Sequence, residues 1–220
     1  MSLDPQELEE LKSKIGRVPT STELQIVAAE WSEHCSYKSS KRHLKMLPMD
    51  GPLVINEKGY DSGVLDVGGG YVVTAHIESH NHPSAVEPYG GAATGVGGVV
   101  RDILSAGTRP IAIFDGLRFG NIEKDKQARW LFKNAVRGVA DYGNCLGIPT
   151  IGGEVEFDDC YENYALVDVA CVGFGRKDKL IKNHAKKGDV VVLLGGSTGR
   201  DGIGGDRKST RLNSSHPSIS

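Results

Sequence analysis

The stretch HIESHNHPSAVEPYGGAATGVGGVVRD, residues 76–102, combines three histidines, acidic side chains and a run of glycines and alanines. In the residues that lead into it, apolar and polar side chains alternate with a period of two, which predicts a β-strand with two distinct faces. The first face holds Tyr71, Val73, Ala75 and Ile77, and the second holds Thr74, His76, Glu78 and His80. We expect the first face to pack in the core and the second to carry chemistry.

A turn and then a helix are predicted after this strand. Pro83 ends the strand, and the glycine-rich residues 90–98 predict a turn. The helix beyond the turn is marked by Val99, Val100, Ile103 and Leu104, and stop signals place its end near residues 106–107. Asp102 falls in the first part of this helix, so the connection can bring Asp102 and Glu78 to one end of the sheet.

The rest of the chain alternates between helical and strand patterns. Helices are predicted at residues 6–15, after a capping box formed by Thr20 and Glu23, and at about residues 125–142. Strands are predicted at residues 111–114 and in YALVDVACVGF, residues 164–174. This alternation indicates an α/β or α+β domain.

Composition narrows the class of protein. The chain has 220 residues, is 39% hydrophobic and has a formal net charge of -2, which indicates a globular protein without a footprint for nucleic acid. No apolar run approaches the roughly 18 residues of a membrane span, and the first residues lack the apolar segment of a secretory signal. We expect a cytoplasmic protein that binds neither nucleic acid nor membrane. The cysteines lack CxxC spacing, so we expect reduced thiols at Cys35, Cys145, Cys160 and Cys171.

The last third of the chain contains an expected boundary. RKDKLIKNHAKKGD, residues 176–189, is a charged stretch, and VVVLLGGSTGRDG, residues 190–202, predicts one buried strand that runs into a glycine turn. Beyond it, residues 206–220 change abruptly to a polar, serine-rich sequence. We interpret this tail as the translation of a sequencing adapter, which would end the natural chain at about Gly205. A disordered terminus is the alternative.

Glu78 and Asp102 predict a Mg²⁺ site. Both are hard oxygen ligands, and Mg²⁺ prefers oxygen and commonly completes its shell with substrate phosphates. The glycines of residues 90–98 fit a phosphate partner, because a backbone without Cβ atoms can approach phosphate oxygens beside a helix N-terminus. The segment matches neither the dinucleotide GxGxxG motif nor a P-loop.

Two further polar clusters are candidates for ligand contacts. Ser79, His80, Asn81 and His82, at the end of a strand, are typical of a rim that contacts a substrate. A zinc site using His76 and His80 is the alternative, although HIESH lacks the spacing of motifs such as HExxH. A structural hydrogen bond is the alternative for any single histidine.

The second cluster is SEHCSYKSSK, residues 32–41, whose polar and cationic side chains suit an anionic ligand. These side chains are His34, Tyr37, Lys38 and Lys41. The alternatives are a nucleophile pair of Cys35 with His34, or a solvated helix start. In GNCLGIPTIGGEVEF, residues 143–157, the glycines are ordinary turn residues on the simplest interpretation, with Glu154 and Glu156 facing solvent.

Four segments together carry a resemblance to a known family: SEHCSYKSSK, ESHNHPSAVEPYGGAATGVGGVVRDIL, GNCLGIPTIGGEV and TGRDGIGG. Up to about Gly205, the chain resembles the synthetase subunits of phosphoribosylformylglycinamidine synthase, the PurL family. The resemblance implies an α/β (α+β) fold, namely a PurM-like N-terminal domain with a mixed sheet and flanking helices, followed by the start of a PurM-like C-terminal domain. In this fold the first sheet pairs with an equivalent sheet to frame the ATP site.

The resemblance also implies an activity. Family members are ATP-dependent C–N ligases that convert formylglycinamide ribonucleotide (FGAR) into formylglycinamidine ribonucleotide (FGAM) through an iminophosphate, in purine biosynthesis. Ammonia comes from glutamine on a PurQ-like glutaminase subunit, and a PurS-like small subunit is a further expected partner. ATP and Mg²⁺ are the expected cofactors.

Individual residues acquire roles from the same resemblance. His34 and His80 would be catalytic, with His80 as proton acceptor; Tyr37 and His76 would contact ATP; Ser79, His80, Asn81, His82 and Arg101 would contact the substrate; Glu78 and Asp102 would each bind Mg²⁺. Many family members carry Lys where this chain has His76. A histidine is charged only part of the time near neutral pH, which weakens the expected ATP contact at this position.

The resemblance implies three segments: residues 1–175 as the ATP- and substrate-binding domain, 176–205 as the start of a second domain, and 206–220 as the tail. Because family members continue well past TGRDGIGG, we expect this chain to be inactive and poorly stable alone. The alternatives are an inactive nucleotide-binding fragment, or a related PurM-type enzyme such as aminoimidazole ribonucleotide synthetase or selenophosphate synthetase. Those two enzymes would not be expected to combine SEHCSYKSSK with ESHNHP.

Overall fold

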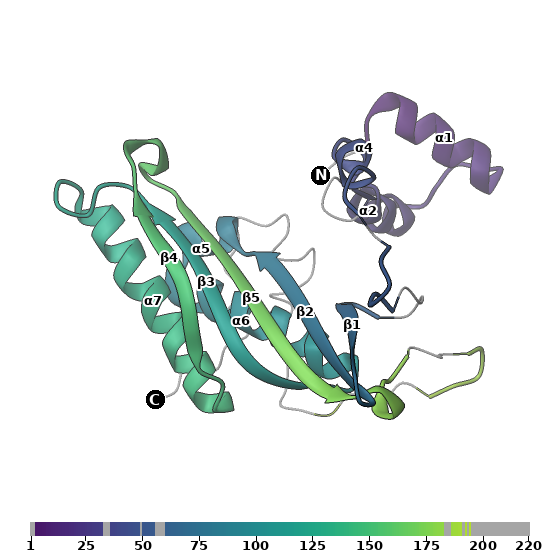
Figure 1. Ribbon diagram of the computed structural model, residues 1–220. Helices are drawn as coiled ribbons and strands as arrows, with labels where there is room; N and C mark the ends of the chain where they lie inside the picture. The colour runs from purple at the N-terminus through teal and green to yellow at the C-terminus, as the bar shows by residue number, and fades with distance from the viewer. Residues whose placement is uncertain are drawn as a thin grey trace. The chain divides into compact units, whose positions relative to one another are not determined.

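The computed structural model describes residues 3–32, 36–48, 50–55, 60–182, 186–190, 192 and 194. It contains two compact units, Met1–Met49 and Asp50–Ser220, and each is described here by itself (Figure 1). The first unit holds α1 (Pro5–Ile15), α2 (Ser21–Glu30) and α4 (Lys41–Leu44). The second holds β1 (Gly63–Gly68), β2 (Tyr71–Ser79), α5 (Asn81–Val86), α6 (Pro88–Ser105), β3 (Arg109–Phe119), α7 (Lys126–Leu146), β4 (Thr150–Phe157), η1 (Asp159–Tyr161), β5 (Ala165–Arg176) and η2 (Lys177–Lys179).

Two helices of the first unit, α1 and α2, begin at capping boxes. Asp4 caps α1 and Thr20 caps α2, and in each case a glutamate three residues later bonds back to the cap backbone. This confirms the predicted capping box of Thr20 and Glu23. The Arg17 guanidinium bonds both carboxylate oxygens of Glu23, and the pKa of Glu23 is therefore lowered to about 2.

The second unit is a five-stranded mixed sheet in the order β1-β2-β5-β3-β4. Its neighbours are antiparallel except β3 and β4, which are parallel. Because β2 and β3 are both antiparallel to β5, they run in the same direction. The connections β2-α6-β3 and β3-α7-β4 therefore each join two parallel strands, and both proceed across the sheet toward β4. Right-handed crossovers in one direction place their helices on one face. Figure 1 shows α5, α6 and α7 on that face, and the mixed sheet with flanking helices is confirmed.

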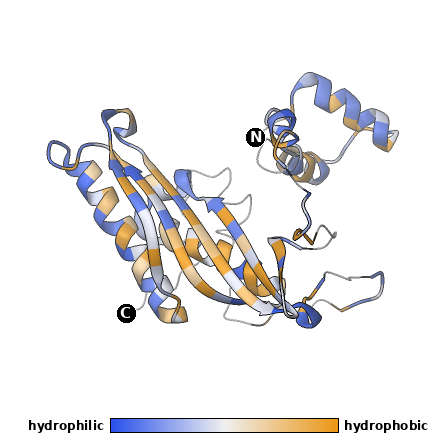
Figure 2. Ribbon diagram, in the orientation of Figure 1, coloured by the Kyte–Doolittle hydropathy of each residue, from blue (hydrophilic) through white to orange (hydrophobic). Residues whose placement is uncertain are grey.

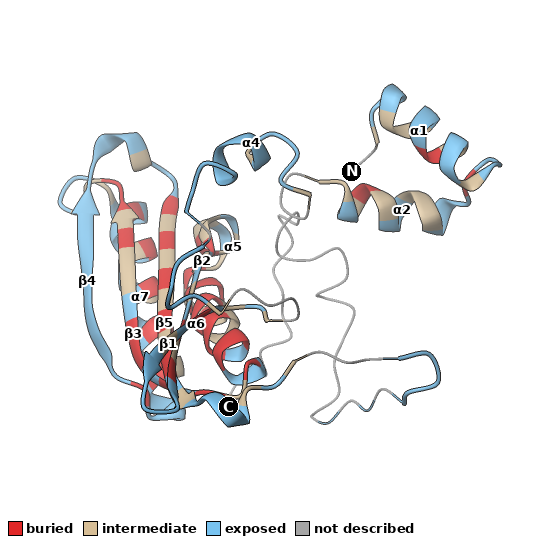
Figure 3. Ribbon diagram, turned by 45° about the vertical axis from the view of Figure 1, so that its right-hand side comes forward, coloured by how far each residue is buried: buried red, intermediate tan, exposed pale blue. Residues whose placement is uncertain are grey.

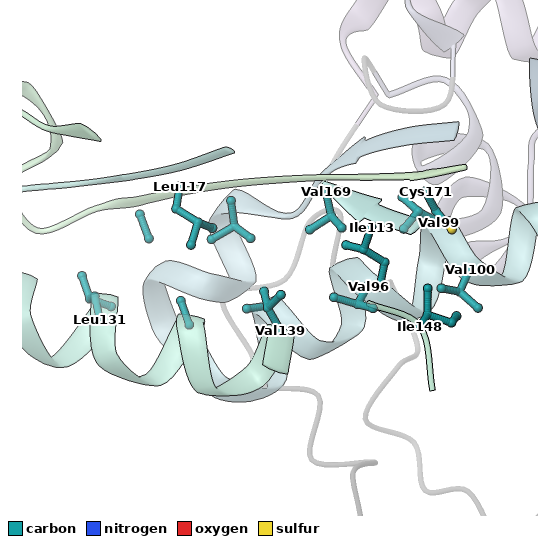
Figure 4. Packing of buried hydrophobic residues seen from close by; sticks show 14 of the residues in the cluster. Val96, Val99, Val100, Ile113, Leu117, Leu131, Val139, Ile148, Val169 and Cys171 are labelled. Carbon is teal, nitrogen blue, oxygen red and sulfur yellow. The ribbon is translucent and has the colours of Figure 1, made fainter. Parts of the chain in front are cut away.

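The core lies between this face of the sheet and the helices α6 and α7 (Figure 4). Alternate residues of β5 point into it, and they are Ala165, Val167, Val169 and Cys171. α7 adds a stripe at helical spacing made of Ala128, Leu131, Ala135 and Val139. Apolar and polar residues accordingly alternate around α7 in Figure 2. Burial also raises the pKa of the Cys171 thiol to about 11, as expected for an unreactive core cysteine.

The core side of β2 lies on the face opposite to the one predicted, although His76 and Glu78 do contribute to the candidate site. The alternation is present, but Val72 and Thr74 are fully buried beneath the helices, whereas Ile77, on the face predicted to be core, is 71% exposed. Figure 3 shows the buried residues on β3, β5, α6 and α7 and an exposed β4 at the edge of the sheet. The physical reason is that crossover direction decides which face the helices cover, and hydrophobicity within one strand does not report it. The opposite face, which no described helix of this unit covers, carries apolar side chains.

The glycine-rich residues 90–98 form a helix, which corrects the predicted turn. α6 already begins at Pro88, with Glu87 as its N-cap, and ends at Ser105 as predicted, before Gly107 at a φ of 84°. Glycine is present at these helix positions because neighbouring groups occupy the space that a side chain would fill. A Cβ on Gly91 would lie 2.5 Å from the Ser84 backbone nitrogen. Close packing with α5 thus outweighs the low helix propensity of glycine.

The strand predicted within residues 190–202 lies mostly outside the described residues. Val190, Val192 and Leu194 are described, and they are exposed and outside any strand, which corrects the expectation of a buried strand at these positions. Such a strand becomes buried only when helices cover both of its faces. The tail at residues 206–220 lies outside the described residues, and the predicted domain boundaries stay predictions.

Candidate functional site

The predicted rim begins where β2 ends, and β5 holds it in place. The Ser79 hydroxyl donates to Asp168 Oδ1 at 2.5 Å, and Asn81 Oδ1 accepts the backbone N–H of Val167 at 2.7 Å. Between them, the backbone N–H of His80 donates to the Val167 carbonyl at 2.8 Å. The Asn81 side chain therefore takes the place of a backbone acceptor and extends the pairing of the two strands beyond the last residue of β2.

The two histidines of the rim differ in environment. His80 is 4% exposed, and its Cβ lies 3.1 Å from the position that a Cβ on Gly95 of α6 would occupy. The His80 carbonyl accepts from the Ser84 hydroxyl at 2.6 Å, which fixes the first turn of α5. His82 is exposed. The structure thus packs His80 beneath the rim and leaves His82 accessible to a ligand.

Glu78 lies between β2 and α6, where it faces a helix position without a side chain. A Cβ on Gly98 would lie 2.3 Å from Glu78 Oε2, a separation that real atoms do not adopt. The carboxylate therefore rests against the bare backbone of α6. This is the close approach that the glycines were predicted to allow, but the approaching group is a carboxylate of the protein itself.

Asp102 lies one turn further along α6, in the last part of the helix and not in its first part as predicted. Its carboxylate accepts from Arg101 Nε at 2.9 Å and lies 3.3 Å from His76 Nε2. Asp102, followed by the charges of Glu78 and Asp61, raises the pKa of Arg101. His76 Nδ1 in turn donates to the Asp61 carbonyl at 2.8 Å.

The structure thus brings together Glu78, Asp102, His76 and Arg101 between β2 and α6. Two carboxylates from different elements fit Mg²⁺, which takes oxygen ligands and leaves further positions for phosphates or water. Among the residues that the structure describes, no three His, Cys, Asp or Glu side chains form a metal-binding group. The N-terminus of α6 is capped by Glu87, and an acidic cap occupies the place predicted for phosphate.

The segment SEHCSYKSSK is only partly described. Residues 33–35, which include His34 and Cys35, lie outside the described residues. Tyr37 is 51% exposed and has a φ of 52°, and Lys38 pairs with Glu7 of α1, which lowers the pKa of Glu7. Both residues belong to the first unit.

Sequence reasoning missed a charged network on the exposed face of the sheet. Arg118 of β3 donates to Glu156 at 2.8 Å, bonds Glu154 and lies 3.8 Å from Asp168 Oδ2. Glu154 and Glu156 were predicted to face solvent, and both are exposed in the structure, where each also pairs with Arg118. Strand alternation could have placed each residue on a face, but the pairing depends on strand order.

Comparison with known proteins bears on the identity of the chain. Residues 59–174 match the family described as AIR synthase related protein, N-terminal domain, and residues 1–38 match the formylglycinamide ribonucleotide amidotransferase linker domain. The phosphoribosylformylglycinamidine synthase subunit PurL of Caldanaerobacter subterraneus is 53% identical over 206 residues, which is 93% of this chain and 28% of that protein. The chain therefore spans less than a third of the length of the curated relatives that it matches.

Solved structures give the same result. Thermotoga maritima PurL complexed with FGAR has a TM-score of 0.77 at 44% identity, over 91% of this chain and 31% of that one. The same protein complexed with ATP has a TM-score of 0.76 at 45% identity, over 90% and 32%. PurLQS from T. maritima has a TM-score of 0.69 at 43% identity, over 82% and 28%.

These relatives confirm the resemblance to PurL that the four sequence segments carry, and the solved structures share the α/β architecture described above. Among the described residues, no helix combines the length and the apolar character needed to cross a membrane. The family match covers more than half of the chain and coincides with the five-stranded sheet and its helices. The chain belongs to the AIR synthase related protein family and carries its N-terminal domain.

Proposed function

We propose that this chain supplies part of the ATP and substrate site of a phosphoribosylformylglycinamidine synthase. The reaction is the ATP-dependent conversion of FGAR into FGAM, with ammonia from glutamine, in purine biosynthesis. The observation that carries the proposal is the meeting of Glu78, Asp102 and Arg101 between β2 and α6, directly beside the rim of residues 79–82. Relatives named for this reaction support it.

The chemistry requires activation of an amide oxygen. ATP transfers its terminal phosphoryl group to the amide oxygen of FGAR, the resulting iminophosphate is attacked by ammonia, and inorganic phosphate leaves as the new C–N bond forms. Phosphoryl transfer depends mainly on positioning and on neutralisation of charge. Mg²⁺ bound by Glu78 and Asp102 would supply that neutralisation.

The rim residues bind and orient FGAR in this proposal. Arg101, whose side chain is 73% exposed beyond its bond to Asp102, faces the substrate phosphate. Ser79, Asn81 and His82 contact the substrate. His80 is the proposed acceptor of the proton that ammonia loses, and because the residue is 4% exposed, this role requires its ring to be uncovered when the substrate binds. His34 is catalytic by resemblance alone, since it lies outside the described residues.

The structural observations support the two proposed ATP contacts, Tyr37 and His76, to different degrees. Tyr37 has an exposed ring that is available to ATP. Both ring nitrogens of His76 are directed at Asp61 and Asp102, so a contact with ATP requires its ring to turn away from them. We propose Tyr37 as the stronger of the two.

The proposal includes partners and a compartment. The T. maritima structure named PurLQS supports a complex with a PurQ-like glutaminase and a PurS-like small subunit. These subunits would deliver ammonia from glutamine. A role in purine biosynthesis supports the cytoplasm as the compartment, which is the expectation from the sequence.

A chimera tests the function. The matched segment of the C. subterraneus relative is replaced by the corresponding residues of this chain, and FGAM formation is measured with FGAR, ATP, Mg²⁺ and ammonium chloride. We expect activity that is lost in Glu78→Gln and kept in Glu9→Gln, which alters an exposed pair in α1. A folded chimera that binds ATP but forms no FGAM would contradict the proposal and favour the alternative of an inactive nucleotide-binding fragment.

A further inference from the structure

The contact between Ser79 and Asp168 joins the candidate substrate rim to the exposed face of the sheet. The two residues are register partners on β2 and β5, and the Ser79 hydroxyl lies 2.5 Å from Asp168 Oδ1. A carboxylate only accepts hydrogen bonds, so the hydroxyl proton of Ser79 must point at Asp168. Ser79 then presents lone pairs, and no proton, to any ligand at the rim.

Asp168 is itself held from the other side. Arg118 Nη1 lies 3.8 Å from Asp168 Oδ2, and the rest of the same guanidinium is held by Glu154 and Glu156. The Arg118 side chain is only 20% exposed and that of Asp168 only 28% exposed, so both are partly screened from solvent. The positive guanidinium attracts Oδ2 of Asp168, while Oδ1 accepts from Ser79.

The charge of this network adds a second constraint. Three carboxylates surround one guanidinium, which leaves a net negative charge at this end of the exposed face. A phosphate group would be repelled here, whereas Arg101, on the other side of β2, would attract one. The part of the ligand that reaches Ser79 is therefore not its phosphate.

We propose that Asp168 is a positioning residue that makes Ser79 an acceptor for a hydrogen-bond donor of the substrate. The inference rests on the proposed function and extends it. It assigns Ser79 as the acceptor in its contact with the substrate, and it gives a role to Asp168, which does not touch the ligand. FGAR offers two kinds of donor, an amide N–H and ribose hydroxyls. Both have the chemistry that Ser79, as oriented here, accepts.

The test uses the active chimera and five variants, namely Ser79→Ala, Asp168→Ala, Asp168→Asn, the double variant of Ser79→Ala with Asp168→Ala, and Asp178→Ala. Asp178 is the matched control, an aspartate paired with Arg176 near the opposite end of β5. We expect Asp168→Ala to raise the KM for FGAR roughly tenfold with kcat nearly unchanged, since the Ser79 hydroxyl is then no longer held as an acceptor for the donor of the substrate. Asp168→Asn should bring the KM for FGAR most of the way back to the parent value, because its amide oxygen can accept the same proton.

Coupling between the residues is the decisive readout. The double variant should bind FGAR no worse than Ser79→Ala, since the two changes remove the same contact with the substrate. Additive effects of the two changes, or an unchanged KM in folded Asp168→Ala, would overturn the inference. If Asp168→Ala fails to fold, a KM in Asp168→Asn as high as in Ser79→Ala overturns it equally. An inactive parent chimera speaks against the proposed function instead.

A substrate analogue distinguishes the two donors. FGAR lacking the ribose 2-hydroxyl should bind more weakly to the parent chimera and equally to Ser79→Ala if that hydroxyl is the donor. An equal loss in both proteins assigns the contact to another donor of FGAR, with the amide N–H as the first candidate. The first result identifies the 2-hydroxyl as the donor to Ser79, and the second excludes it.

Discussion

At the scale of single residues, the candidate metal site depends on a glycine as much as on its carboxylates. The space of a Cβ on Gly98 is filled by Glu78 Oε2, so Gly98→Ala must displace that carboxylate. We expect the chimera carrying this change to need at least about tenfold more Mg²⁺ for half-maximal activity, as is typical when the surroundings of a metal ligand are altered. A Mg²⁺ titration of initial rates measures it.

Gly97→Ala is the control for this prediction. A Cβ there would meet only the tip of the Tyr142 side chain, at 2.8 Å from its hydroxyl, and that ring can move without touching Glu78. Its Mg²⁺ requirement should match the parent. If the two alanine variants respond alike, Glu78 is not the group that Gly98 accommodates.

Asp115 is a second residue whose environment makes a prediction. It lies on β3 between the buried residues Ile113 and Leu117, and burial raises the pKa of its carboxyl. An acid with a raised folded pKa stabilises the protein below its unfolded pKa, near 4, and this contribution is lost as pH rises through the folded value. At pH 7 the ionised carboxylate is therefore unfavourable.

Asp115→Asn should consequently raise the melting temperature of the 220-residue chain at pH 7, and the difference from the parent should vanish near pH 3.5. Differential scanning calorimetry at both pH values measures the change. Asp158→Asn serves as a comparison, because hydrogen bonding to Cys160 lowers the pKa of Asp158 and the predicted sign is reversed. A lower melting temperature of Asp115→Asn at pH 7 would mean that the charged form makes a stabilising contact.

At the scale of elements, local signals predicted the existence of helices and strands better than their position in the fold. The cap at Thr20 and the stripe of α7 identified their helices, because both signals are encoded within a few residues. α6 was predicted to begin late, since glycine reads as a turn residue. The glycines of α6 are explained by close contacts with residues such as Glu78 and His80, which lie well before them in the sequence, and the sequence alone does not show these contacts.

The same argument holds for the site. Glu78 and Asp102 were predicted because they are oxygen ligands at the end of a strand and in the helix that follows it, and the rim was predicted because four polar residues stand together in the sequence. Asp168 and Arg118 were missed because they are single charges on separate strands, and only the register of β2, β5 and β3 brings them to Ser79.

Gly138 of α7 gives a prediction at this scale. In an open helix, Gly→Ala stabilises by about 1 kcal/mol. A Cβ at Gly138 would instead lie 2.2 Å from the Tyr89 carbonyl oxygen of α6, so the two helices would have to separate. We expect Gly138→Ala to destabilise the chain by roughly 1–3 kcal/mol, as overpacking in a core does.

Urea unfolding of the 220-residue chain measures this free energy. Asn144→Ala, at an exposed position of the same helix, is the matched control and should be neutral or slightly stabilising. Stabilisation by both changes would mean that α6 and α7 pack less closely than the structure has them.

At the scale of the whole molecule, strand order determines which face of each strand is buried, and the local sequence does not specify this. The parallel crossovers through α6 and α7 cover one face of the sheet, and the alternation of β2 therefore leaves apolar residues on the other. The first unit contributes little core of its own, since its buried hydrophobic residues within the described part are Leu11 and Ala28. Most of the apolar burial thus belongs to the second unit.

The exposed face of the sheet yields the last prediction. Ile77 is 71% exposed, Phe114 38% and Phe174 40%, and contiguous apolar patches of this kind promote association. We expect the 220-residue chain to bind a hydrophobic dye and to self-associate at micromolar concentration, and Ile77→Ser with Phe114→Ser to reduce both, as measured by dye fluorescence and analytical ultracentrifugation. Val136→Ser, on the exposed side of α7 and 40% exposed, is the control and should change neither. A monomeric parent chain without dye binding would contradict this prediction, because the face would then tolerate water without a partner.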